Sequence, residues 1–449
     1  MHINFCSAKI LKHLWLCYFM PNKMQKVISE QIRLLRPDES SIKELNNRSK
    51  KFIDRLKQEI LKSGIEADVF VGGSFAKNTL IKSENYDVDI FVRFDWKYES
   101  ISNMLEKFLH NIENKLDLKI ERVHGSRDYF IVHLNSISGY FEVIPVMKIR
   151  KPHEERNVTD LTYFHGPYVK KRIKGFEDQV RLAKKFLKAQ EVYGAETYVK
   201  GFSGYTVELL IIKYKSFVKM LKELIKVKSD KRLVIDIEKH YKNPNDVFIQ
   251  LNEAKLHSPV VLIDPTYKER NALAALSHET FAKFQKSAVA FLKNPSSKFF
   301  EKKSLDVNEI RKKSKSKKLD FVIIELKTDK QAGDIAGTKL KKFFDFLERE
   351  IHGGFVLKDS YFKYSGGNSG LGYIVSKPKK ETVRIGPPLH LKKAVSSFKN
   401  KHAVTFEKNK HIHAKLKIKF SLKEFLDSWI SGNEKVLREM HVTDIDVKD

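Results

Sequence analysis

The sequence predicts a multidomain α+β protein, and three observations carry that prediction. The chain has 449 residues, which exceeds one typical domain of roughly 150 residues. Amphipathic helical periodicity alternates with β-rich runs near both ends of the chain. Between them, residues 176–225 keep the helical spacing of apolar side chains. We therefore expect an α+β segment, a helical segment and a second α+β segment.

The first α+β segment is predicted to run to about residue 160, with residues 1–24 as an extension before it. Apolar side chains at three-to-four spacing predict a helix over residues 41–63 that ends at Gly64. Apolar alternation predicts strands in the rest of the segment. The further elements expected are a strand over 68–71, a short helix over 74–82, a strand over 86–93, a helix over 100–116, and strands near 118–123, 129–134 and 140–146.

Helices are predicted to dominate residues 161–295. Besides the helical spacing in 176–225, another helix is expected over 271–292. Proline and a polar run predict a loop over 262–270. In the last segment, residues 296–449, we expect a strand over 319–326, a helix over 337–350, a strand over 373–376 and a hairpin of residues 403–407 and 411–420.

The chain is strongly basic, with 85 Lys and Arg against 56 Asp and Glu and a formal net charge of +29. Such an excess raises self-repulsion unless a polyanion neutralises it, so nucleic acid is the expected partner. A hydrophobic content of 41% excludes a disordered basic tail protein. Cys6 and Cys17 are the only cysteines, which fits a reducing, cytoplasmic setting. The apolar stretch over residues 3–20 is interrupted by Lys9 and Lys12, so we expect no membrane span.

The C-terminal hairpin is predicted to concentrate cations on one strand face. In residues 411–420, His411, His413, Lys415, Lys417 and Lys419 alternate with apolar side chains. We predict that the three lysines bind RNA phosphates, with a solubilising sheet face as the alternative. Another basic run, residues 291–320, is predicted to be a solvated connection, with a polyanion contact as the alternative.

Candidate catalytic residues occur in two motifs of the first segment. Gly72, Gly73 and Ser74 join a strand to a helix, where backbone N–H groups suit a phosphate chain. Asp87 and Asp89 lie on a predicted strand with one residue between them, so their carboxylates face the same way. Like charges this close favour a divalent cation, and Mg²⁺ takes oxygen ligands of this kind. Two solvated acids on an edge strand are the alternative.

A two-metal site needs a third carboxylate from another strand, and Glu142 is the candidate. It is the single acid in the apolar run over residues 140–146. Because burying it without a partner would be unfavourable, it must face water, a partner or a metal. We predict that Asp87, Asp89 and Glu142 are the catalytic and metal-binding residues.

These motifs resemble the nucleotidyltransferase superfamily that contains DNA polymerase β. Later motifs resemble one branch of it, the archaeal class I CCA-adding enzymes. They are residues 162–165, 177–184, 193–196, 201–208, 264–271, 384–388 and 447–449, in order and with similar spacing. The resemblance implies a polymerase β-like catalytic head (25–160), a helical nucleotide-binding neck (161–295), and an α+β body with a basic C-terminal tail that binds tRNA (296–449).

The resemblance also implies roles for individual residues. Ser74 and Lys77 would hold the triphosphate, with Lys77 standing where many relatives have Arg. Asp87, Asp89 and Glu142 would hold Mg²⁺, with Glu142 standing where relatives commonly have Asp. The nucleotide pocket would be lined by Thr162, His165, Lys184, Tyr193 and Arg270, of which the last would help to read the incoming base.

From the residues alone, structural alternatives stay open at several of these positions. His165 is compatible with a hydrogen-bonded loop histidine, Tyr193 with a core aromatic side chain and Arg270 with a salt bridge. Lys184 is compatible with an exposed position on a charged helix.

The reaction that the resemblance implies is template-independent transfer of CMP, CMP and AMP from CTP and ATP to the 3′ end of tRNA, with release of pyrophosphate. A homodimer is compatible with the sequence. Two alternatives remain: a poly(A)-type or oligoadenylate-type nucleotidyltransferase with the same head, and an RNA-binding scaffold with an inactive head. Incorporation of CTP into tRNA that lacks its end distinguishes the first, and the presence of all three acids argues against the second.

Overall fold

The computed structural model describes residues 22–116, 118–133, 139–228, 230–302 and 306–449. The chain forms two compact units that divide between residues 303 and 304. In the described part of the chain, no helix is long and apolar enough to cross a membrane. Both cysteines and residues 1–21 of the predicted extension lie outside the described residues, and residues 22–24 begin a helix over residues 22–35.

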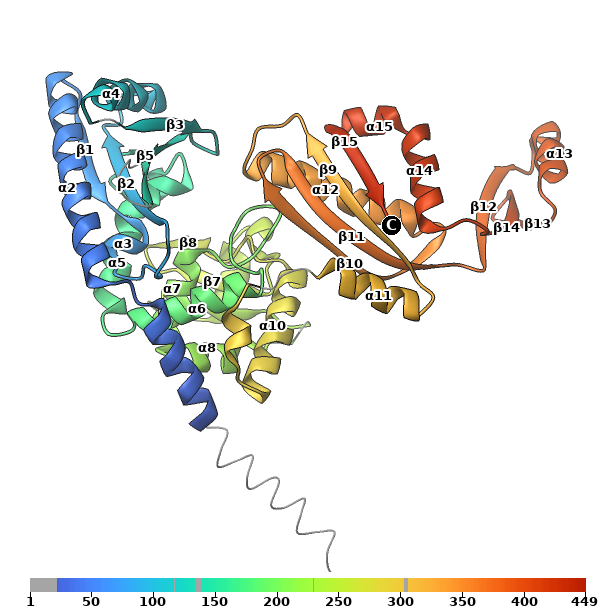
Figure 1. The fold of residues 1–449 in the computed structure, drawn as a ribbon, viewed down its shortest axis with the longest axis horizontal. Coiled ribbons are helices and arrows are strands. Elements are labelled where there is room, and N and C mark those ends of the chain that lie inside the picture. The colour runs from blue at the N-terminus through green and yellow to red at the C-terminus, as the bar shows by residue number, and fades with distance from the viewer. Residues whose placement is uncertain (1–21, 117, 134–138, 229, 303–305) are drawn as a thin grey trace, which may run out of the picture. The chain divides into compact units, whose positions relative to one another are not determined.

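The first half of unit 1, the head, is a five-stranded sheet backed by two long helices (Figure 1). The strand order is β1-β2-β5-β4-β3; β2 and β5 pair in parallel and the other neighbours pair antiparallel. All seven elements were predicted, and their bounds differ from the prediction by at most two residues at either end. They are β1 Ala67–Val71, β2 Tyr86–Phe94, β3 Lys119–Val123, β4 Tyr129–His133, β5 Gly139–Met147, α2 Glu39–Lys62 and α4 Ile101–Leu116.

Alternation along β2 separates the core from the other face of this sheet. Val88, Ile90 and Val92 are fully buried and share a core with Leu56 of α2 and Leu105 of α4. Because successive side chains on a strand point to opposite faces, the odd-numbered positions of β2 point away from these helices. The predicted alternation is confirmed.

The helix after β1 is shorter than predicted. α3 spans Gly73–Ala76 and does not continue to residue 82. Asn78 has a left-handed φ of 54°, which ends the helical path. Residues 78–80 are instead held by the neck, because Arg181 donates hydrogen bonds to the carbonyl oxygens of Asn78 and Leu80 at 2.6 and 2.7 Å. The local propensity is overridden by this contact.

The second half of unit 1, the neck, is mainly helical, as predicted. Its buried core is distinct from that of the head and includes Val27 and Leu35 from the helix over residues 22–35. Most of that helix falls in the range expected for the head, residues 25–160, but it packs into the core of the neck. The helices are α5 Thr162–Ile173, α6 Glu177–Ala189, α7 Gly204–Tyr214, α8 Phe217–Leu224, α9 Pro244–Gln250 and α10 His278–Lys293.

The predicted loop over residues 262–270 is wrong. Strands β7 (Val260–Asp264) and β8 (Tyr267–Asn271) pair antiparallel, and β6 (Leu233–Ile235) pairs in parallel with β7. The next helix begins at His278, because the buried side chain of Asn271 accepts hydrogen bonds from the backbone N–H groups of Leu262 and Leu273 and keeps residue 271 in the sheet. Proline and polar residues here form the turn of a hairpin.

Unit 2 contains an antiparallel sheet of order β10-β11-β9-β15 (Figure 1). Side chains of α12 and α14 pack on one face of it, and Val307 and Ile310 of α11 pack with Phe321 and Tyr373 on the other. The solvated connection predicted for residues 291–320 is therefore wrong over α11. The elements are α11 Val307–Ser316, β9 Asp320–Thr328, α12 Asp334–Ile351, β10 Phe355–Gly366, β11 Ser369–Pro378, α14 Leu422–Gly432, α15 Glu434–Glu439 and β15 Val442–Lys448.

A second, three-stranded sheet in unit 2 contains the predicted hairpin. β13 (Thr405–Lys408) and β12 (Glu381–Pro388) flank β14 (His411–Lys417), and α13 (Lys392–Lys401) packs beside them. Lys415 and Lys417 are exposed, as predicted, whereas Lys419 lies two residues beyond the end of β14. His413 is buried and stacks on Phe406 at 5.3 Å between ring centroids, so it is not part of an exposed cationic face. The prediction for His413 and Lys419 is corrected, because the cross-strand aromatic ring covers the first and the strand ends before the second.

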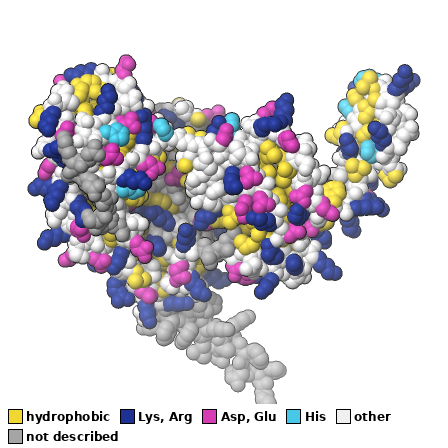
Figure 2. Space-filling view, turned by 45° about the horizontal axis from the view of Figure 1, so that its top comes forward, with side chains coloured by type: hydrophobic (Ala, Val, Ile, Leu, Met, Phe, Trp, Pro, Cys, Tyr) yellow, Lys and Arg dark blue, Asp and Glu magenta, His cyan; other side chains and the backbone are white. Residues whose placement is uncertain are grey.

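The cationic side chains are not confined to this sheet. Figure 2 shows Lys and Arg spread over the visible face of each unit and interspersed with Asp and Glu. On this face the cationic side chains are therefore not gathered into one patch.

Candidate active site

Three carboxylates lie on the face of the head sheet that points away from α2 and α4. Asp87 and Asp89 occupy odd positions of β2, and the parallel pairing places Asp89 directly opposite Glu142 of β5. Tyr140 is opposite Asp87 in the same register. Asp87 is exposed, whereas Asp89 and Glu142 are half-buried. The parallel register thus brings together two acids that are far apart in the chain.

The glycine turn before α3 presses against Asp89. A Cβ added to Gly73 would lie 1.5 Å from the Asp89 Oδ2 atom, and Gly73 has a φ of +59°. The backbone N–H of Gly72 donates a hydrogen bond to the backbone oxygen of Asp89 at 2.9 Å. Only glycine fits this approach. Ser74 therefore follows immediately after a turn that touches a candidate catalytic acid.

Burial and the charge of neighbouring carboxylates raise the pKa values of Asp89 and Glu142. Burial raises the pKa of Asp89 to about 6, Asp87 adds to the effect, and Lys77 and Lys184 oppose it. Burial also raises the pKa of Glu142 to about 7, with further contributions from Asp89 and Asp87. Burial is the larger cause of both shifts, and repulsion between the neighbouring carboxylates adds to it.

The residues present fit a divalent cation by their chemistry. Oxygen donors from two adjacent strands repel one another, and a cation between them would relieve that repulsion. Among the described residues, no three Asp, Glu, His or Cys side chains are already converged as ligands around one point. The three carboxylates are therefore suitable donors for a cation. The described side chains do not already converge on one point as a complete set of ligands.

Two lysines from different parts of unit 1 share one buried acid. Glu208 of α7 is fully buried, and its Oε2 and Oε1 atoms lie 2.5 Å from Lys77 Nζ and 3.0 Å from Lys184 Nζ, respectively. Lys184 Nζ also donates to Thr79 Oγ1 at 3.2 Å, and Thr79 Oγ1 donates to Glu208 Oε1 at 3.3 Å. Burial opposes ionisation of Glu208, but Lys184 and Lys77 lower its pKa. Lys184 is thus buried, and the alternative of an exposed lysine is wrong.

A second buried acid organises the other end of the site. Asp264 Oδ2 lies 2.7 Å from Arg270 Nη1 and 2.9 Å from His165 Nε2. Asp264 Oδ1 accepts hydrogen bonds from Tyr205 OH at 3.0 Å and from the backbone N–H and hydroxyl of Thr266 at 2.9 and 2.8 Å. The His165 and Tyr205 rings stack with their centroids 3.9 Å apart. Arg270 lies on β8, and a salt bridge holds it.

Thr162 and Tyr193 are less tightly connected to these clusters. Thr162 is the first residue of α5 and is half-buried. Tyr193 packs against the neck core, and the Lys188 Nζ atom lies 5.0 Å from its ring centroid. Burial raises the pKa of the Tyr193 hydroxyl, so the phenol stays neutral. Gly204 allows this ring to approach, because a Cβ there would lie 2.9 Å from the Tyr193 OH.

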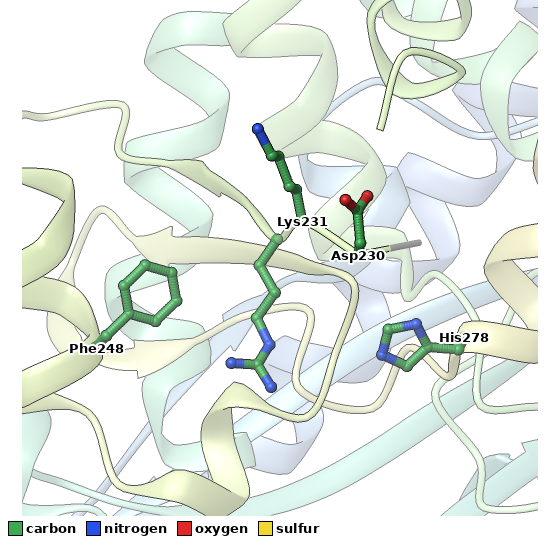
Figure 3. A pocket seen from close by; sticks show the side chains of 5 residues that line it. Asp230, Lys231, Phe248 and His278 are labelled. Atoms are coloured by element: carbon green, nitrogen blue, oxygen red, sulfur yellow. The ribbon is translucent and has the colours of Figure 1, made fainter. Parts of the chain in front are cut away.

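The structure brings the predicted residues together in part. Lys77 and Lys184 meet around Glu208, and His165 and Arg270 meet around Asp264. Lys415 and Lys417 lie in unit 2. A separate hollow of about 540 Å³ in the neck contains none of the predicted residues (Figure 3); it is lined by Asp230, Lys231, Arg232, Phe248 and His278.

Sequence reasoning assigned no role to Glu208 or Asp264, although both occur in the motifs noted above. Each carries a signal that could have revealed it. Glu208 is a lone acid among the buried apolar residues of α7, and Asp264 ends the fully buried strand β7. An acid in such surroundings must be paired, because an isolated buried carboxylate is unfavourable. The partner of each acid could not be read from the sequence.

Comparisons with known proteins agree on one family. Residues 178–301 match the family described as "tRNA nucleotidyltransferase, second domain". The chain is 34% identical to the CCA-adding enzyme of Nanoarchaeum equitans over 354 residues, covering 77% of this chain and 83% of that protein. It is 28% identical to the CCA-adding enzyme of Methanocaldococcus jannaschii, covering 85% of each chain.

Solved structures with a similar arrangement are more distant. The poly(U) polymerase Cid1 superposes with a TM-score of 0.48 at 11% identity, covering 62% of this chain and 98% of that chain. CdnC of Escherichia coli gives a TM-score of 0.46 at 15% identity, covering 61% of this chain and 94% of that chain.

Proposed function

This chain belongs to the CCA-adding enzymes, which are tRNA nucleotidyltransferases, and on that premise we propose which of its residues perform the addition of CCA to tRNA. Asp87, Asp89 and Glu142 are the catalytic acids. The observation that carries this assignment is the parallel register of β2 and β5, which sets Asp89 beside Glu142 on the open face of the sheet. The close approach of Gly73 to Asp89 supports it, because a phosphate-binding turn belongs next to the metal ligands.

We propose that the three acids hold Mg²⁺. When bound, the cations stabilise the deprotonated 3′-hydroxyl of the tRNA and the charge of the triphosphate and the departing pyrophosphate. The 3′-hydroxyl gives up its proton to solvent, its oxygen forms a bond to the α-phosphorus, the bond between the α-phosphorus and the bridging oxygen breaks, and pyrophosphate leaves with that oxygen. Asp87 is the exposed member of the set, so it is the acid that substrate can reach first.

The remaining predicted residues bind the nucleotide in this proposal. Ser74, Lys77 and Lys184 contact the triphosphate, since the two ammonium groups lie close enough to Asp89 to oppose the rise in its pKa. Thr162 and Tyr193 contact the sugar and base. His165 and Arg270 flank the base, because Asp264 holds both in place, and a guanidinium presents planar donors that match base acceptors.

The basic unit 2 binds the tRNA backbone in this proposal. Lys415 and Lys417 are exposed on β14, and Lys419 follows it. Phosphate contacts of this kind position the RNA without reading its sequence, and they weaken as salt increases. Because tRNA is the substrate, we place the enzyme in the cytoplasm.

A single assay tests the proposal. The protein is incubated with tRNA that ends before its last three nucleotides, with labelled CTP or ATP and Mg²⁺. We expect addition of CMP, CMP and then AMP by the wild type, and no addition by Asp89→Ala, whose tRNA affinity should stay within about twofold of wild type. Glu121→Ala is the matched control, since Glu121 is an exposed acid of the same sheet. Addition of a long AMP tail without CMP would contradict the proposal, as would a large loss of tRNA binding by Asp89→Ala.

A further inference from the structure

The lysines predicted to bind triphosphate depend on an acid that has no assigned role. Glu208 faces the ammonium groups of Lys77 and Lys184 from inside the protein, and its side chain is 0% exposed, against 13% and 6% for the two lysines. The rest of its carboxylate contact is the hydroxyl of Thr79. Glu208 is therefore the buried anion that stabilises two ammonium groups largely shielded from water.

The charges of this cluster do not cancel. Two ammonium groups and one carboxylate leave an excess of one positive charge, which a further anion such as the Asp89 carboxylate or a bound ligand would balance. This excess positive charge acts on the proposed catalytic acids, because both lysines oppose the rise in the pKa of Asp89. A polyanionic ligand beside Asp89 would complete the cluster, and the triphosphate of a nucleotide has this chemistry.

The cluster also joins the head to the neck. Lys77 and Thr79 follow α3 in the head, whereas Lys184 and Glu208 lie on neck helices α6 and α7. Arg181 closes the same junction one turn away on α6, through its hydrogen bonds to the carbonyl oxygens of residues 78 and 80. The two ammonium groups therefore come from opposite sides of the junction, and one side chain sets the position of both.

We propose that Glu208 is a positioning residue for the nucleotide: it holds the Lys77 and Lys184 ammonium groups charged and fixed beside the catalytic acids, so that both contact the triphosphate of CTP and ATP. This inference rests on the function proposed above. Glu208 makes no contact with the nucleotide itself. Its removal should therefore weaken nucleotide binding while the acids and the tRNA contacts stay intact.

The first test is the variant Glu208→Gln in the full-length enzyme, with tRNA that lacks its last three nucleotides. Gln has the same shape but no charge, so Lys77 and Lys184 face each other across a neutral amide, and one of them turns away or loses its proton. We expect the KM for CTP and for ATP to rise at least tenfold. The kcat at saturating nucleotide should stay within about threefold of wild type, and the Kd for tRNA should not change.

A second pair of variants separates positioning from stability. Leu224→Ala removes a fully buried side chain of the neck core and leaves the lysine cluster intact, so it should lower Tm without raising the nucleotide KM. The double variant Glu208→Gln with Lys184→Met returns the cluster to one excess positive charge. It should recover Tm relative to Glu208→Gln and keep the raised KM, because one phosphate contact is still missing.

The outcomes decide between the alternatives. The inference is overturned if Glu208→Gln keeps a nucleotide KM within twofold of wild type, or if the double variant recovers KM together with Tm. Should Glu208→Gln not fold, the double variant is compared with Lys184→Met alone: a nucleotide KM that is higher in the double variant supports the inference, because Lys77 has then also lost its buried partner, and an equal KM overturns it. Failure of the proposed function gives a different result, since the wild-type enzyme would then incorporate no CMP.

Discussion

Replacing Asp264 by asparagine should destabilise unit 1 and loosen the proposed nucleotide pocket together. Asp264 is fully buried and is the common partner of His165, Tyr205, Thr266 and Arg270. Asparagine keeps an oxygen that can accept the hydrogen bonds from Tyr205 and Thr266. It removes the negative charge that faces the Arg270 guanidinium, so the variant isolates the electrostatic part of the cluster.

The expected loss follows from the burial of the pair. Leaving one member of a buried ion pair without its partner costs about 3–5 kcal/mol. The side chain of Arg270 is 22% exposed, so water recovers part of that energy, and we expect a loss of about 2–4 kcal/mol. At about 2–4 °C per kcal/mol for a large domain, Tm should fall by roughly 4–16 °C.

The loss should depend on pH with a definite sign. Burial alone would raise the pKa of Asp264, but His165 and Arg270 hold it well below its ordinary value. A carboxyl with a lowered folded pKa contributes stability above its unfolded value of about 3.9 and loses it as pH falls toward the folded value. The difference in Tm between wild type and Asp264→Asn should therefore be full at neutral pH and should shrink below about pH 4.

Thermal melts of the two proteins from pH 3 to pH 8 measure this effect, with Glu269→Gln as the matched control because Glu269 is an exposed acid next to Arg270 on β8. Burial lowers the pKa of His165, so protonation of the unfolded histidine reduces the stability of all three proteins below about pH 6.5. Asp264 raises the pKa of His165 against this burial, so the effect is larger in Asp264→Asn, and the comparison at pH 7, above this range, isolates the ion pair. A Tm for Asp264→Asn within 1 °C of wild type at pH 7 would refute the reasoning, because Arg270 would then not depend on this charge.

Three further outcomes are expected. Arg270→Ala should raise misincorporation of UTP and GTP more than it slows addition of the correct nucleotide, because it removes planar donors near the base; a lowered Tm with unchanged selectivity in the addition assay would make Arg270 purely structural. Glu142→Asp should stay active in that assay, since the shorter acid still carries the charge opposite Asp89, whereas Glu142→Ala should be inactive; an active alanine variant would place the third ligand elsewhere. Replacing Lys415, Lys417 and Lys419 by Gln should weaken tRNA binding and flatten the slope of log affinity against log salt. The change should be about 2 units for the three lysines, because Lys415 is already paired with Glu381 at 3.6 Å. An unchanged slope would place the RNA on another surface.

The strands of the head and the faces of their side chains could be predicted from local periodicity in the sequence. On β2, Val88, Ile90 and Val92 face the core while Asp87 and Asp89 face away, and both facts follow from a repeat of two residues. The same reasoning identified the strand that carries Glu142. It failed where distant contacts decide the local conformation: the helix after Gly73 stops early because Arg181 holds residues 78–80.

Strand pairing could not be predicted from the sequence, because it too depends on contacts between residues that are distant in the chain. The run over residues 262–270 contains proline and several charged residues, yet Asn271 ties it into a hairpin through hydrogen bonds to Leu262 and Leu273. β10 was not predicted, because many of its side chains are polar and at least half-exposed, so no clean alternation of apolar residues marks it.

The sequence by itself determined the family, the two acids of β2 and the basic character of the chain, since these depend on residue identity and short spacing. Only the tertiary structure decided which acid meets which cation. Lys77 and Glu208 are 131 positions apart, and nothing local in either segment specifies that their side chains meet at 2.5 Å. The pairing follows from how the head packs on the neck helices, where a buried carboxylate is tolerated only because cations from both sides reach it.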